Sequence, residues 1–162
     1  MHLLDANAFM EASRLYYSFQ IAPRYWDWLV DKFNEGEIAS VEAVYDEITA
    51  GTGDLVAWAK APALSGFWLP DTADSIAATA DLATWAAHAD RPFKQSAVDE
   101  FMASADLRLA AQAHVPGATV VTRETSDPAC KKRVKLPDAA KSVGVTCVQP
   151  FVAYERLGLK FS

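Results

Sequence analysis

Thr119-Val120-Val121-Thr122 decides the fold, because four consecutive β-branched residues predict a buried strand. A second strand is expected at Val145–Val148, after Gly144, and a third at residues 2–4, an apolar run that ends at Asp5. Helical patterns separate these strands along the chain. Short strands that alternate with helices predict a parallel sheet covered on both faces. We therefore expect an α/β protein with three layers, α/β/α, around a central and mostly parallel sheet.

Helices are expected where apolar residues recur at three- and four-residue spacing. These segments are residues 8–19, 23–33, 41–48, 54–61, 72–89, 96–114 (interrupted near Ser104), 137–143 and 152–157. Ile38-Ala39-Ser40 is expected to be a break between helices, with Ser40 as the next N-cap. Phe67-Trp68-Leu69 is either a short strand or an aromatic anchor. A chain of 162 residues predicts one domain, here with a helical insert at about residues 52–95.

The composition is that of a globular protein, with 51% hydrophobic residues. No apolar run approaches the roughly eighteen residues that cross a bilayer, so no membrane partner is expected. Residues 1–5 lack the basic flank and long apolar stretch of a signal peptide. Cys130 and Cys147 are too few for a disulfide framework and are expected to be reduced. We therefore expect a cytoplasmic protein.

The formal net charge of −6 argues against a nucleic-acid partner, because phosphate binding needs a positive surface. The charge is unevenly distributed, however, since Lys131, Lys132, Arg133, Lys135 and Lys141 crowd into one short segment. This segment is either an ordinary solvated loop or a basic rim beside an acidic cleft. Lys131, Lys132 and Arg133 are the candidate RNA-binding residues.

Acidic residues stand at four places where an α/β fold gathers its chemistry. They are Asp5 after the first strand, Glu47 on a helix, Asp106 at the start of an apolar helical stretch and Glu124 after the strand at 119–122. Mg²⁺ and Mn²⁺ prefer oxygen ligands, and carboxylates that converge without a cation repel one another. Convergence therefore predicts a bound metal. Two such ions can activate a water and stabilise both the attacking and leaving oxygens of a phosphodiester.

Each acid also has a structural explanation. Asp5 and Asp106 are candidates for the N-cap of the helix that follows each of them. Glu124 is a candidate for an ion pair with Arg123 or Lys131. Taken singly, none of these acids defines a site.

Position in the elements distinguishes some neighbouring candidates. Glu47 lies three residues after Val44, in the buried stripe of its helix, whereas Asp46 does not. Thr122 is either a hydroxyl that orients a carboxylate or an ordinary β-branched strand residue. The three histidines show no ligand spacing, so zinc is not expected.

The order of these motifs resembles the PIN-domain family over residues 2–150. Asp5 followed by the small polar Asn7 resembles the family's first motif, and Glu47 with Gly51 resembles its early-helix Glu. Residues 106–113 resemble the Asp that opens an alanine-rich helix, and residues 121–124 resemble its strand ending Val-Thr-x-acid.

Two departures from the family pattern concern the fourth acid and the insert. The fourth acid is usually Asp, and Glu124 reaches further. The longer insert and the segment Lys135-Leu136-Pro137-Asp138 resemble a PIN-like branch with a late Lys-x-Pro-Asp segment. In that branch Asp138 shares or takes over the role of the fourth acid.

The resemblance implies an endoribonuclease that depends on Mg²⁺ or Mn²⁺. It implies a VapC-like fold, the toxin role in a type II toxin–antitoxin pair, an antitoxin protein as partner and a homodimer. Asp5, Asp106 and Glu124 or Asp138 would bind the metal. Glu47 would bind a second ion or the water network, and Asn7 and Thr122 would support the site.

Two other classes remain open. Haloacid-dehalogenase-type phosphatases place Asp-x-Asp after their first strand, but Asn7 stands where their general acid would be. A metal-free PIN-like module that only binds RNA or a protein is the other alternative. The absence of a glycine-rich phosphate loop argues against a P-loop or Rossmann protein.

Overall fold

β1 (His2–Leu4) is the central strand of a five-stranded sheet in the computed structural model, which describes residues 1–161. It pairs with β2 (Ile38–Val41) on one side and β4 (Thr119–Val121) on the other. β3 (Trp68–Leu69) and β5 (Cys147–Val148) complete the order β3-β2-β1-β4-β5. Every pairing is parallel, so the carboxyl ends of the strands share one edge of the sheet.

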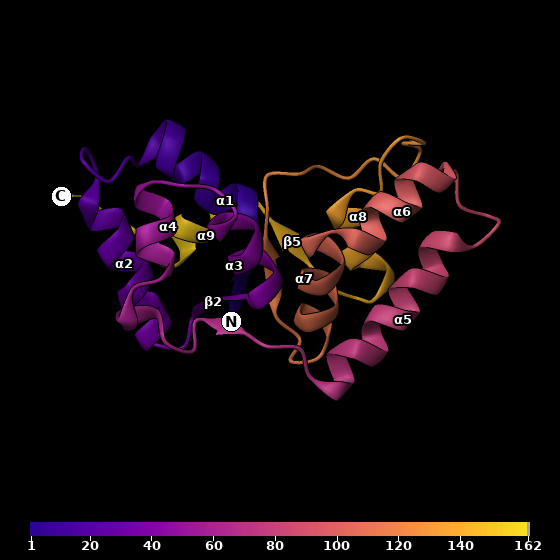
Figure 1. Cartoon of the computed structure of the whole chain (residues 1–162), viewed down its shortest axis with the longest axis horizontal. Coiled ribbons are helices and arrows are strands. Elements are labelled where there is room, and N and C mark those ends of the chain that lie inside the picture. The colour runs from indigo at the N-terminus through magenta and orange to yellow at the C-terminus, as the bar shows by residue number, and fades with distance from the viewer. Residues whose placement is uncertain (162) are drawn as a thin grey trace.

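Helices cover both sides of this sheet (Figure 1). They are α1 (Ala6–Glu11), the π-helix η1 (Ala12–Tyr16), α2 (Pro23–Asn34), α3 (Glu42–Thr49), α4 (Asp54–Ala59), the 3₁₀-helix η2 (Pro62–Leu64), α5 (Ala73–Ala87), α6 (Gln95–Ala103), α7 (Ala105–His114), α8 (Leu136–Ser142) and α9 (Pro150–Arg156). In Figure 1, α2 and α4 lie at the left of the view and α5 to α8 at the right. The three-layer α/β/α architecture expected from the sequence is confirmed.

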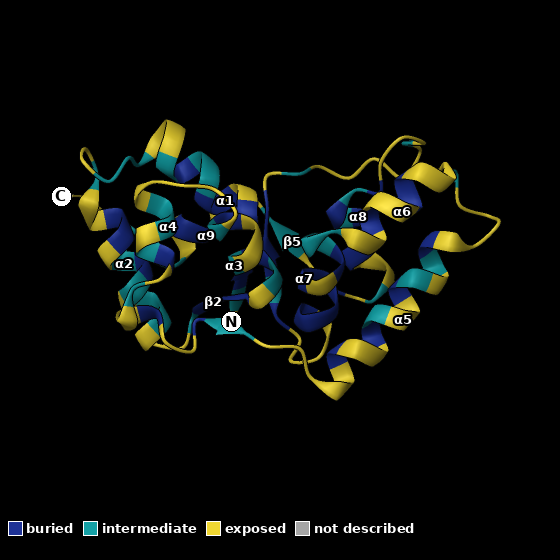
Figure 2. Cartoon of the chain, in the orientation of Figure 1, coloured by how far each residue is buried: buried dark blue, intermediate teal, exposed yellow. Residues whose placement is uncertain are grey.

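The core begins at the two central strands. Leu3, Leu4, Val120 and Val121 have no exposed surface. The neighbouring strand β2 is buried along its whole length and is dark blue in Figure 2. Burial of large aliphatic side chains contributes about 1.5–3 kcal/mol each, which offsets the entropy of ordering these strands. The register pairs Leu4 with Val121, and this places the residues after the two strands side by side.

Aromatic residues fill the space between α1 and the edge of the sheet. The Phe9 ring of α1 lies 5.6 Å from the Trp68 ring of β3 and 6.1 Å from the Phe67 ring, measured between centroids. Such pairs contribute about 0.5–1.5 kcal/mol beyond their burial. Phe9 therefore anchors α1, the helix that directly follows Asp5.

The expectation of a break at residues 38–40, with Ser40 as an N-cap, was wrong. These residues belong to β2, which is buried at all four positions, and the N-cap of α3 is Val41. The Ser40 hydroxyl instead donates to the Leu4 carbonyl at 2.6 Å. A run of four residues with Ala39 and Ser40 in its middle has weak strand propensity, so tertiary burial determined the outcome.

The segment expected as a helical insert contains α4 and α5 but also β3, which forms one edge of the sheet. The long helix α5 packs against α7, so the segment belongs to the same body. The interruption expected near Ser104 is confirmed, because α6 ends and α7 begins there.

No helix within residues 1–161 is long and apolar enough to cross a bilayer. Cys130 and Cys147 are free thiols, as expected.

Candidate active site

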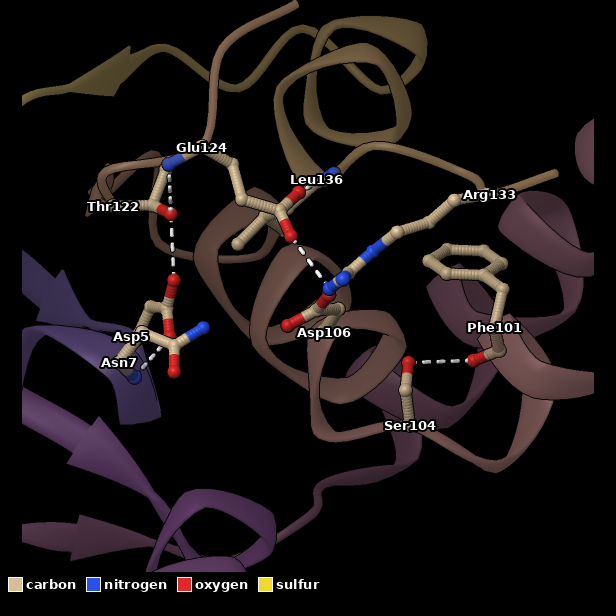
Figure 3. Close-up of polar contacts among 9 residues, drawn as sticks. All are labelled: Asp5, Asn7, Phe101, Ser104, Asp106, Thr122, Glu124, Arg133 and Leu136. Carbon is tan, nitrogen blue, oxygen red and sulfur yellow. Dashed lines mark hydrogen bonds and ion pairs between the residues drawn. The ribbon is translucent and has the colours of Figure 1, made fainter. Parts of the chain in front are cut away.

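Asp5 is held at the carboxyl end of β1 by two hydrogen bonds. One carboxylate oxygen accepts from the backbone N–H of Asn7 at 2.6 Å, so Asp5 is also the N-cap of α1. The other accepts from the Thr122 hydroxyl at 2.6 Å. The Thr122 hydroxyl accepts in turn from the Glu124 N–H at 3.1 Å (Figure 3). Asp5 therefore caps α1, and Thr122 orients the Asp5 carboxylate.

Asp106 stands in the first turn of α7, two residues after Ser104. The Ser104 hydroxyl donates to the Phe101 carbonyl, which stabilises the corner between α6 and α7. Asp106 does not provide the N-cap, because Ser104 occupies that position. Its half-buried side chain instead faces the cleft that Asp5 also lines.

Burial and mutual repulsion perturb both aspartates. Burial raises the pKa of Asp5 to about 6, although its hydrogen bonds from Thr122 and Asn7 act in the opposite direction. Burial, followed by repulsion from Asp5 and Glu124, raises the pKa of Asp106 to about 7, and Arg133 opposes this rise. Strongly perturbed carboxyl groups of this kind concentrate at functional sites.

Glu124 is the third acid of the site, and both of its oxygens are engaged. One accepts from the Arg133 guanidinium at 2.6 Å, and the other accepts from the Leu136 N–H at the start of α8 at 2.8 Å. The same Arg133 nitrogen lies 4.0 Å from an Asp106 carboxylate oxygen. The guanidinium therefore stands between two acids, as Figure 3 shows.

Asp5, Asp106 and Arg133 line an open cleft of about 640 Å³. Its ionisable lining residues are Asp5, Asp46, Glu47, Glu100, Asp106, Arg108 and Arg133, and Asn7 also contributes. Five carboxyl groups thus face two arginines, and Arg108 is itself paired with Asp71. The excess of negative charge makes this the natural position for a cation.

Five predicted residues are not among those that line the cleft: Thr122, Glu124, Asp138, Lys131 and Lys132. Asp138 is buried, and its oxygens accept from the Ser126 hydroxyl and the Asp127 N–H, so it holds the loop before α8. Lys131 and Lys132 are exposed and do not line the cleft, whereas the neighbouring Arg133 does. Glu124, unlike Asp138, shares the Arg133 guanidinium with Asp106.

Sequence patterns did not single out Glu100, Arg108 or the pairing of Arg133. Glu100 lies on α6 beside the buried Phe101, and helix periodicity alone gives no reason to place it in a cleft. Asp46 lines the cleft together with Glu47, although only Glu47 was expected there. Clustered acids need a positive charge nearby, and this was the one feature of the sequence that could have predicted the pairing of Arg133 with the site.

A family model described as a domain of unknown function, DUF4411, matches residues 2–161. The chain belongs to the DUF4411 family. No curated protein and no solved structure matches it.

The donor groups of this DUF4411 site suit a hard divalent cation in kind, because carboxylate oxygens are what Mg²⁺ and Mn²⁺ prefer. Burial and, to a smaller extent, repulsion from neighbouring carboxylates raise the pKa values of Asp5 and Asp106, and a bound cation would stabilise their charged forms. Within residues 1–161, no group of three or more His, Cys, Asp or Glu side chains is already arranged to hold a metal ion. Binding would draw Glu124 away from Arg133, or would recruit the exposed Glu47.

The raised pKa values predict that stability falls as the pH rises when divalent ions are chelated. Asp5 and Asp106 hold their protons more tightly when folded than at the ordinary value of 3.8. The free energy of unfolding therefore decreases between about pH 4 and pH 7 and levels off above. For Asp5 alone the difference corresponds to about 3 kcal/mol. Urea unfolding in EDTA at several pH values measures it.

Asp106→Asn should remove part of this pH dependence and should stabilise the protein above about pH 7, because it removes a charge that burial and repulsion disfavour. Asp81→Asn, an exposed position on α5, is the matched control and should change neither. An Asp106→Asn protein with the wild-type pH dependence would contradict the assigned repulsion.

Proposed function

We propose that this protein is a PIN-type endoribonuclease that uses Mg²⁺ or Mn²⁺ to hydrolyse RNA phosphodiester bonds. The observation that carries the proposal is the convergence of Asp5 and Asp106, which are far apart in the sequence, at one cleft. Both carboxyl groups are buried or half-buried, and burial together with repulsion from neighbouring carboxylates raises their pKa values. A purely structural role does not explain why two carboxyl groups that destabilise the folded state when charged lie at one cleft.

The order of the acids along the fold supports the PIN-type assignment. Asp5 follows β1, Asp106 opens α7, and Glu124 follows β4, all around a parallel sheet. Asp46 and Glu47 of α3 also line the cleft. This is the sequence of positions in which the family resemblance places its acids.

The chain's own residues divide the work of hydrolysis. Asp5, Asp106 and Glu124 would hold the metal, with Glu47 available for a second ion. The ion would supply an activated water and stabilise charge on the phosphate oxygens. Thr122 and the Asn7 N–H orient Asp5. Arg133, once released from Glu124, offers a guanidinium for the substrate phosphate, the contact geometry in which arginine is strongest.

The wider biological role belongs to the same proposal. We propose a cytoplasmic toxin of a type II pair, inhibited by an antitoxin protein and able to form a homodimer. Exposed apolar residues, including Leu15, Ile21 and Phe151, are compatible with a protein partner.

A metal-free binding module is the second candidate, because one observation favours it. The Arg133 guanidinium already satisfies Glu124 and lies near Asp106, which is the charge balance that a cation would otherwise supply. In that case the cleft would bind a partner without cleaving it.

Cleavage of an end-labelled structured RNA pool tests the proposal. We expect cleavage that requires Mg²⁺ or Mn²⁺, stops in EDTA, and falls at least about 100-fold in Asp5→Asn, since even groups that only support metal ligands cost 10–100-fold. Asp81→Asn should retain full activity. Undiminished cleavage by a folded Asp5→Asn protein would refute the site, and a folded wild type that never cleaves would favour the binding module.

The exposed pair Lys131 and Lys132 should contribute long-range attraction to RNA. Replacing both with alanine should weaken RNA binding and reduce the slope of log affinity against log salt by up to about 1.4, or 0.7 for each phosphate that a lysine no longer neutralises. Fluorescence anisotropy over a salt series measures the slope. An unchanged slope would identify the segment as an ordinary solvated loop.

A further inference from the structure

A second cleft, of about 430 Å³, is lined in part by the same two helices, α1 and α3, that line the acidic one. Its lining residues are Met10, Ser13, Arg14, Phe19, Gln20, Ile48, Gly51, Thr52, Asp54, Leu55 and Val56. The two clefts share their walls: α1 contributes Asn7 to the first and Met10 to the second, and α3 contributes Glu47 to the first and Ile48 to the second. Asn7 and Met10 are three apart on α1 and are therefore neighbours on its surface, which brings the two linings close together along this helix.

The second cleft differs from the first in its chemistry. It combines an apolar wall with hydroxyl and amide groups, and its cation is Arg14. The Arg14 side chain is exposed and makes no salt bridge or side-chain hydrogen bond within residues 1–161. Asp54 is the only carboxylate among the lining residues, and it accepts a hydrogen bond from the Gln20 amide at 2.8 Å.

An unusual backbone presents Arg14 to this cleft. The chain leaves α1 through the π-helix η1, and the Tyr17 N–H donates to the Ala12 carbonyl five residues earlier at 2.6 Å. π-helical turns are rare and occur frequently at functional sites. The turn from α3 to α4 also contributes to the cleft. It needs Gly53, because few residues other than glycine adopt a φ of 102°. The turn carries Thr52 into the lining.

We propose that the second cleft is a nucleotide subsite that binds the single-stranded RNA segment beside the scissile bond. Arg14 would bind a phosphate of that segment, and a base would lie against the apolar wall that includes Phe19 and Leu55. The volume lies within the range of about 300–1,000 Å³ that ligand pockets occupy. The inference rests on the proposed ribonuclease function and assigns the nucleotide subsite to this cleft, where a base can lie against the protein only if it is unpaired.

The two clefts differ in how their charges act on an RNA segment. The acidic cleft repels a polyanion unless a cation is bound there, whereas Arg14 attracts it without one. Arg14 thus supplies affinity at a distance from the reacting phosphate. It is a positioning residue rather than a catalytic one.

Binding of a fluorescein-labelled single-stranded oligoribonucleotide tests this subsite, measured by anisotropy with proteins that carry Asp5→Asn to prevent cleavage. Adding Arg14→Ala should weaken binding several-fold and reduce the salt slope by about 0.7, the value for one phosphate on a single strand. Adding Asp54→Asn should tighten binding, because a competing charge is removed while its side-chain oxygen still accepts from Gln20. Opposite signs cannot both arise from unfolding.

Arg24→Ala on α2, which lines neither cleft, and Asp81→Asn are the charge-matched controls. Equal effects of Arg14→Ala and Arg24→Ala would overturn the subsite and leave the ribonuclease proposal standing. Equal binding of the same oligonucleotide when annealed to its complement would also overturn it. Arg14-dependent binding by a wild type that cleaves no RNA would support the subsite and defeat the nuclease.

Discussion

The hydrogen bond from Thr122 to Asp5 is the interaction on which the rest of the site depends. It exists because β1 and β4 pair in parallel with Leu4 opposite Val121, so the first residue after each strand meets the other. Burial of the strand residues fixes that register, since a slip by one residue would turn the apolar side chains out of the core. The stability of the sheet and the orientation of the acid are therefore one constraint.

That constraint buries a carboxylate near other acids, and nearby residues offset part of the resulting negative charge. Asp5 is nearly inaccessible, and Asp106 and Glu124 add charge close by. Burial disfavours the charged forms, and the carboxyl pKa values rise accordingly. Arg133 offsets part of the charge from a long polar segment between β4 and α8. A divalent cation would offset more, and in doing so would release the arginine toward a phosphate.

Much of this architecture could be predicted from the sequence, for physical reasons that differ between residues. Buried strands such as 119–121 are recognisable by their β-branched residues, and acids directly after such strands, like Asp5, lie at the carboxyl edge. β2 could not be predicted, because its small residues are strand-forming only once buried between two neighbours. The position of Arg133 could not be predicted either, because a polar segment without periodicity does not indicate where its side chains point. Whether the site acts on RNA stays a proposal.

Binding of Mn²⁺ at neutral pH tests the central claim most directly, because it does not require the right RNA. Free Mn²⁺ can be counted by electron paramagnetic resonance during titration of the wild type, Asp5→Asn and Asp81→Asn. The account predicts that the wild type and Asp81→Asn bind one or two ions with the same affinity, and that Asp5→Asn binds at least about tenfold more weakly. A wild type that binds no Mn²⁺, or an Asp5→Asn protein that binds it equally well, would contradict the assignment of these acids as a metal site.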